Sequence, residues 1–186
     1  MADLSNVTRA FDWILAYYKD VAKIFAELQA QVTAQGFEML TDGAMDTAQS
    51  KTLQGTRQWA ATYCYQFFTP AGADDELLVV MVVGHAAGVS APYVCLARFT
   101  GQGVRGKYRE VTYWWNEAGA HEDPDAWAES AFKSMKVQHA WFPLSRIAGL
   151  PDVKTSMVDP LIALHSEAVA AAAAAGTGAA PPAEGE

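Results

Sequence analysis

Apolar side chains recur along the first part of the chain at alternating steps of four and three residues. This is the seven-residue repeat by which helices pack along a narrow apolar seam. Ser5 has the side chain of a helix N-cap, and Gly36 stands where a helix ends. The pattern therefore predicts one long helix, Leu4–Gln35. Its seam positions are Val7, Phe11, Ile14, Tyr18, Val21, Phe25, Leu28 and Val32.

The seam leaves two interpretations of this helix open. In the first, the helix packs across a sheet and covers one face of it, as helices with a wide apolar stripe do. In the second, it pairs with its own copy in a homodimer, because a sustained heptad repeat also fits a second helix. Tyr18 and Phe25, one repeat apart, are the interface residues expected in the second case.

After Arg57 the period of the apolar positions changes to two, which indicates β-strands. The connecting loops, 70–76, 85–92 and 101–107, are rich in Gly, Pro or Asp, and each is shorter than the roughly twelve residues of a parallel crossover. We therefore expect an antiparallel meander in chain order. Its four strands are Arg57–Thr69, Leu77–Gly84, Tyr93–Thr100 and Tyr108–Asn116, of which the second, apolar on both faces, is central.

Two aspartate–proline pairs carry the start signal of a helix, since Asp caps the first turn and Pro fits its first position. Asp123–Pro124 predicts a helix that runs to about Val137 or His139. Its apolar side, spaced by four residues, is Trp127, Ala131 and Met135. Asp159–Pro160 predicts a second helix, which stops at Gly176.

Together these elements predict an α+β fold. It has a four-stranded or slightly larger antiparallel meander sheet, a long N-terminal helix packed across the sheet, and two C-terminal helices. We expect a single domain over residues 1–175 and a disordered tail over residues 176–186. The parts of the domain are the long helix 1–35, a linker 36–56, the sheet 57–116 and the C-terminal helices 123–175.

Composition narrows the range of partners. The net charge of −8 argues against binding to nucleic acid or to an anionic membrane surface, because phosphates attract basic proteins. No apolar run reaches the roughly 18 residues of a membrane span, and the N-terminus has no signal sequence, so we expect a cytoplasmic protein. In that compartment Cys64 and Cys95 are expected to be reduced, buried and inert.

Motifs for chemistry are weak. Gly101, Gly103 and Gly106 match a dinucleotide-binding pattern, but they lead into a predicted strand instead of a helix, so we interpret them as turn residues with positive φ. The acidic run at 121–125 lacks the spacing of a calcium loop. No nucleophile stands in a catalytic motif. We assign no catalytic, cofactor-binding or metal-binding residue, and we expect no cofactor.

Arg98 and Arg109 lie on predicted neighbouring strands, with Arg105 in the turn between them. Such a group of guanidinium groups binds a carboxylate or phosphate. Alternatively, these arginines pair with the chain's own acidic residues. Trp114 and Trp115 are adjacent in a predicted strand and therefore point to opposite faces, so one of them lies outside the helix-covered core and is available to an interface.

These features favour a non-enzymatic protein-interaction module: an accessory, regulatory or inhibitory protein that acts by binding another protein. The alternative is a small-ligand sensor, with a pocket between the sheet and the helix and with residues 36–55 as a flap. An enzyme of unknown class ranks third, because no catalytic motif supports it.

Overall fold

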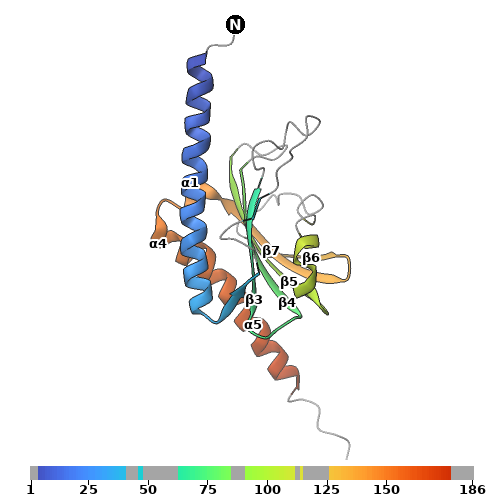
Figure 1. Cartoon of the computed structure of the whole chain (residues 1–186). Coiled ribbons are helices and arrows are strands. Elements are labelled where there is room, and N and C mark those ends of the chain that lie inside the picture. The colour runs from blue at the N-terminus through green and yellow to red at the C-terminus, as the bar shows by residue number, and fades with distance from the viewer. Residues whose placement is uncertain are drawn as a thin grey trace, which may run out of the picture.

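The computed structural model describes residues 4–40, 46–47, 63–84, 91–111, 114 and 126–176. It confirms the α+β class: one antiparallel sheet lies beneath a long N-terminal helix and a C-terminal helical segment (Figure 1). The strands follow each other across the sheet in the order β1-β3-β4-β5-β7-β6, and the short β2 also pairs with β3. The strands are β1 (Phe37–Met39), β2 (Asp46–Thr47), β3 (Tyr63–Pro70), β4 (Glu76–Val83), β5 (Tyr93–Thr100), β6 (Ala128–Phe132) and β7 (Met135–Pro143).

Strand β4 is the centre of the sheet, as its sequence predicts, and all eight of its residues are buried. Its side chains alternate between two separate cores. Leu78, Val80 and Val82 belong to the core on one face, and Leu77, Val79 and Met81 belong to the core on the other. This division explains why β4 lacks the polar–apolar alternation of a strand with one wet face.

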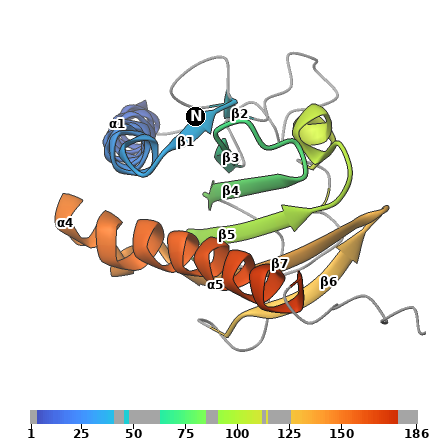
Figure 2. The same cartoon turned by 90° about the horizontal axis from the view of Figure 1, so that it is seen from below.

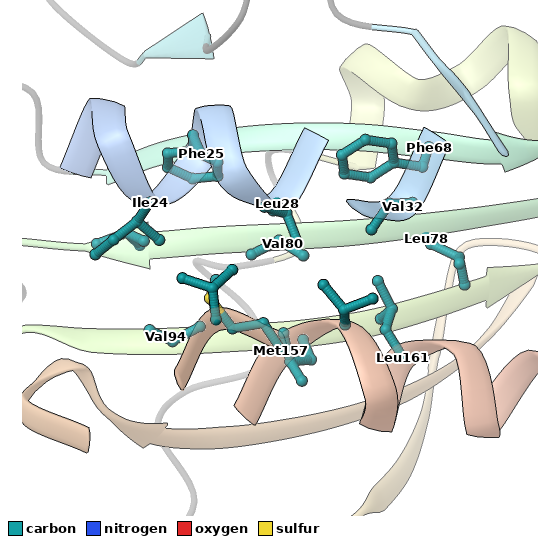
Figure 3. Close-up of a cluster of buried hydrophobic side chains, with 14 of the residues drawn as sticks. Ile24, Phe25, Leu28, Val32, Phe68, Leu78, Val80, Val94, Met157 and Leu161 are labelled. Carbon is teal, nitrogen blue, oxygen red and sulfur yellow. The ribbon is translucent and has the colours of Figure 1, made fainter. Parts of the chain in front are cut away.

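The long helix α1 (Leu4–Ala34) runs along the first face of the sheet, and its C-terminal half packs there (Figure 3). Its buried side chains are Val21, Ile24, Phe25, Leu28 and Val32. Beside it on the same face lies a second helical segment, which consists of α4 (Leu150–Val153), η4 (Lys154–Val158) and α5 (Asp159–Gly176). Figure 2 shows this segment crossing the sheet diagonally.

The C-terminal helical segment begins earlier than its sequence predicts. Its start is at Leu150, where the Asp152 carboxylate accepts hydrogen bonds from the backbone N–H groups of Ala148 and Gly149, each 2.9 Å long. Pro160 lies inside the helix, where it has no N–H to donate and crowds the preceding turn. The chain accommodates it by widening into the π-helical turn η4, in which the Asp159 N–H bonds to the Lys154 carbonyl.

The predicted strand Tyr108–Asn116 is wrong. Residues Val104–Lys107 form the 3₁₀-helix η2, and Tyr108–Val111 form the helix α2, on the face of the sheet opposite α1. Gly101 and Gly103 both have positive φ and turn the chain onto that face instead of into a hairpin. Val104 and Val111, seven residues apart as on one side of a helix, are both buried there. Of the rest of the predicted strand, the structure describes only residue 114.

The predicted helix from Pro124 is also wrong. Residues 128–143 form the hairpin β6–β7, with Lys133 in the left-handed region at φ +54° in its turn. β7 takes the place beside β5 that the meander assigned to residues 108–116. The spacing of four at Trp127, Ala131 and Met135 is therefore coincidental. The strand instead follows a period of two, and its alternate residues Met135, Val137, His139 and Trp141 are all buried. Residues 123–125 lie outside the described residues.

Candidate functional site

The N-terminal half of α1 extends beyond the sheet (Figure 1). The lengths of the elements require this, since α1 has 31 residues and is therefore about 46 Å long, whereas an eight-residue strand such as β4 spans about 26 Å. The difference of about 20 Å corresponds to roughly 13 helical residues. Phe11, Trp13 and Leu15 in this segment are 62%, 66% and 57% exposed, whereas Val21 and the seam residues after it are buried. We call residues 7–20 the projecting segment.

Apolar side chains occupy one continuous side of the projecting segment. At about 100° per residue, Phe11, Ile14, Leu15 and Tyr18 fall within about 100° of the helix circumference, and Tyr17 and Trp13 continue the same side to about 200°. Ile14, Tyr17 and Tyr18 are half-buried. The charged residues occupy the remaining circumference, and they are Arg9, Asp12, Lys19 and Asp20.

Trp13 and Tyr17 mark the point where the projecting segment meets the body of the protein. Their rings stack with centroids 5.9 Å apart, and they line a shallow hollow of about 280 Å³ together with Leu144 and Ile147. The Tyr17 hydroxyl is buried without a hydrogen-bond partner in the described part of the chain. Burial raises the pKa of Tyr17 well above its ordinary value, with a smaller contribution from the nearby Cys64.

The residues that the sequence assigns to an interface fall in different places. Phe25 is completely buried against the sheet, which agrees with the core-packing interpretation for this half of the helix. Tyr18 lies at the margin of the same core. Trp114 is buried on the opposite face, where its ring contacts Phe99, His139 and Trp141. Trp115 lies outside the described residues.

The three arginines do not gather at one site. Arg98 Nε donates to Glu76 Oε1 at 2.8 Å, and Arg98 Nη1 donates to Gln138 Oε1 at 3.1 Å. Arg105 pairs with Glu38 across 2.6 Å. Arg109 lies on α2, where it donates to the Tyr108 hydroxyl at 3.2 Å. The predicted proximity of Arg98 and Arg109 depended on the strand 108–116, which does not form.

Glu76 and Arg98 belong to a partly buried polar network that the sequence analysis missed. His165 on α5 lies with its Nδ1 2.9 Å from Glu76 Oε1, and Gln138 also donates to Glu129 at 3.2 Å. The register of β4, β5 and β7 places Glu76, Arg98 and Gln138 on the helix-covered face of the sheet. No local pattern predicts this network, because its members come from β4, β5, β6, β7 and α5.

An open cleft of about 900 Å³ borders this network. Its lining is mostly polar or charged, and it includes Asp74, Asp75, Glu76, Arg98, Thr100, Glu129, Lys136 and Gln138. Among the described residues, no three or more His, Cys, Asp or Glu side chains form a group that could hold a metal ion. The acidic run 121–125 lies outside those residues.

The two cysteines lie on opposite faces of the sheet, Cys64 in the core beneath α1 and Cys95 in the core beneath α2. Both are buried and free, as the sequence predicts. Burial raises the pKa of Cys64 to about 11 and that of Cys95 well above its ordinary value. A thiol kept protonated in this way is a poor nucleophile.

Comparison with known proteins returned no match to a protein-family model, to a curated protein or to a solved structure. Among the described residues, no helix has the length and apolar character needed to cross a membrane.

Proposed function

We propose that this chain is a non-enzymatic interaction module that binds a protein partner through the projecting segment of α1. The observation that supports this proposal most directly is an apolar helical surface outside the chain's own core, with Phe11, Trp13 and Leu15 each more than half exposed. Large apolar side chains on one side of a helix are the usual anchors when a helix packs against another helix or into a groove.

The size of this surface supports an interaction. The exposed parts of Phe11, Trp13 and Leu15 amount to about 400 Å², taking roughly 150–250 Å² for each complete side chain. The largest apolar patch on a monomeric protein is typically about 300–600 Å² and is often functional. A helix without a partner ordinarily shows polar residues on its solvent side, so the apolar side of this segment is best explained by a partner.

The ligand-sensor alternative has less support. It requires a pocket between the sheet and the helix or the 36–55 flap, and small-molecule sites are mainly apolar with a few polar groups. The cleft beside Glu76 and Arg98 is open, and charged side chains make up much of its lining. Most of the flap lies outside the described residues.

Site-specific photo-cross-linking tests the proposal. Benzoylphenylalanine replaces Phe11 or Leu15 in the projecting segment. As a control it replaces Ala30, which is exposed on the polar side of the C-terminal half of α1, the half that is anchored to the sheet. We expect irradiation in cells to give a discrete protein adduct from positions 11 and 15 and none from position 30. Equal adduct formation from all three positions, or none from any, would contradict the proposal.

A further inference from the structure

We infer that a second copy of this chain covers the projecting segment when no other partner is bound, with the two segments packed antiparallel. This inference rests on the proposed function, because it identifies one occupant of the same surface. The order of seam positions, the placement of charge and the position of the folded body along α1 all support it.

The order of seam positions makes the projecting segment complementary to itself. Before Val21, where burial begins, the seam positions of α1 are Val7, Phe11, Ile14 and Tyr18. They are two a and two d positions of the heptad, and in an antiparallel pair a residues pack against d residues of the other helix. One register satisfies all four: Phe11 faces Ile14 of the second copy, and Tyr18 faces the register position of Val7. Shifting one helix by a full repeat towards the body would pair Phe11 with Val21, which is already buried in its own core. The opposite shift would place the position that faces Tyr18 beyond Leu4, where α1 begins.

Charge also permits a second copy at this surface. Two chains of net charge −8 repel each other over most of their surfaces. The projecting segment is an exception, since its two basic and two acidic side chains cancel. The positions that flank the seam here are Thr8, Leu15, Ala10 and Tyr17, none of them charged. Neither like-charge repulsion nor burial of a charge therefore opposes the contact.

The position of the folded body favours the antiparallel arrangement. The sheet packs against the C-terminal half of α1 (Figure 1). Antiparallel pairing of the projecting segments therefore places the two bodies at opposite ends of the pair, where they do not collide. Parallel pairing would place both bodies at the same end, side by side, where their acidic surfaces would repel.

The area predicts a dimer of moderate affinity. The exposed parts of Phe11 and Leu15 supply about 200–250 Å² per copy. With the half-buried Ile14, Tyr17 and Tyr18, two copies bury roughly 700–800 Å², which is the size of a weak, reversible interface. We therefore expect a dissociation constant in the micromolar range.

Sedimentation equilibrium of the full chain at about 1–100 μM measures this association. Phe11→Glu places a carboxylate in the seam of both helices, so we expect the dissociation constant to rise at least 100-fold. The control, Ala30→Glu, adds the same charge on the polar side of α1 and should leave the constant within about threefold. A chain that is monomeric at 100 μM, or equal weakening by both variants, would overturn the inference. Because Phe11 is mostly exposed, circular dichroism should show both variants folded.

Spin labels measure the orientation of the two helices. With Cys64 and Cys95 buried, a label reacts with a cysteine introduced at Asp12 or Lys19. In the antiparallel register the two Asp12 positions lie at nearly the same height, whereas the two Lys19 positions are about 20 Å apart along the axis. Parallel helices would give similar distances at both positions and would overturn the arrangement.

The mass of the cross-linked adduct formed from position 11 distinguishes this inference from the proposed function. An adduct with the mass of two chains supports the second copy. An adduct with a different protein, together with a monomeric purified chain, overturns the second copy and leaves the proposed function standing. A monomeric chain that forms no adduct overturns both.

Discussion

Replacing each of two phenylalanines on the same seam of α1 with alanine tests the division of this helix into an anchored and a projecting half. Phe25 is completely buried in the core beneath α1, so Phe25→Ala should cost about 3–5 kcal/mol of the free energy of unfolding. Phe11 is 62% exposed, so only somewhat more than a third of its surface is buried in the folded chain. Phe11→Ala should therefore lower the free energy of unfolding by less than about 1 kcal/mol.

Urea unfolding followed by tryptophan fluorescence and by circular dichroism measures both changes. For a chain of this size, 1 kcal/mol corresponds to about 2–4 °C in the melting temperature. The melting temperature of the Phe25→Ala variant should therefore lie roughly 5–15 °C below that of the Phe11→Ala variant. The measurement is made at sub-micromolar concentration, below the expected dissociation constant of the dimer. At higher concentration only the cost of Phe11→Ala should grow, because dimerisation stabilises the folded state. Equal costs at low concentration would refute the division.

Three further predictions concern the buried polar groups. Tyr17→Phe removes a buried hydroxyl that has no hydrogen-bond partner among the described residues. In urea unfolding it should therefore leave the free energy of unfolding unchanged or raise it by up to about 1 kcal/mol. A clear loss of stability would show that the hydroxyl forms a hydrogen bond. Arg98→Leu removes the guanidinium that pairs with the largely buried Glu76 and should lower the free energy of unfolding by about 3 kcal/mol. Adding Glu76→Gln should recover more than half of this loss, because it removes the unpaired charge. A double variant no more stable than Arg98→Leu alone would contradict the pairing. The raised thiol pKa values mean that the folded chain keeps protons that the unfolded chain releases, so stability should fall as pH rises from about 9 towards 11, by roughly 1.4 kcal/mol per pH unit for Cys64 alone. The slope should become shallower in the Cys64→Ala variant, and an unchanged slope would assign it to other groups.

Elements with a long, regular apolar period were predictable from sequence. The seam of α1 repeats over nearly four heptads, and β3, β4 and β5 combine strand periodicity with loops too short for a crossover. Local information was sufficient here because neighbouring signals agree. The short strands β1 and β2 were missed for the opposite reason: with three and two residues, they carry no detectable period.

The two errors arose where short segments fit more than one period. Residues 108–116 carry aromatic and β-branched residues that suit a strand. Two glycines with positive φ nevertheless direct the chain onto the opposite face, where residues 104–111 form short helices. Residues 127–135 show a spacing of four, whereas pairing with β5 makes 135–143 a strand. Tertiary pairing decides between periods of similar strength, and a single sequence does not contain that information.

The candidate site was predictable in part. The seam was visible in the sequence, but its division into a buried and an exposed half was not assigned. A signal was nevertheless present, because a predicted helix of 32 residues is about 48 Å long, whereas three of the four predicted strands have only eight or nine residues and span about 30 Å or less. The network of Glu76, Arg98 and His165 gave no comparable signal, since 89 residues separate the carboxylate from the imidazole.

The two halves of α1 depend on each other physically. A helical segment of about 13 residues is marginal in water on its own, because nucleating it costs more than its few hydrogen bonds return. Here the buried C-terminal half supplies the nucleus, and the helix propagates outward through a stretch without Gly or Pro from Leu4 to Ala34. The projecting segment is thus already ordered before any partner arrives, so little conformational entropy is lost on binding. A modest apolar surface can then bind with useful affinity because the sheet beneath Phe25 and Leu28 holds it in place.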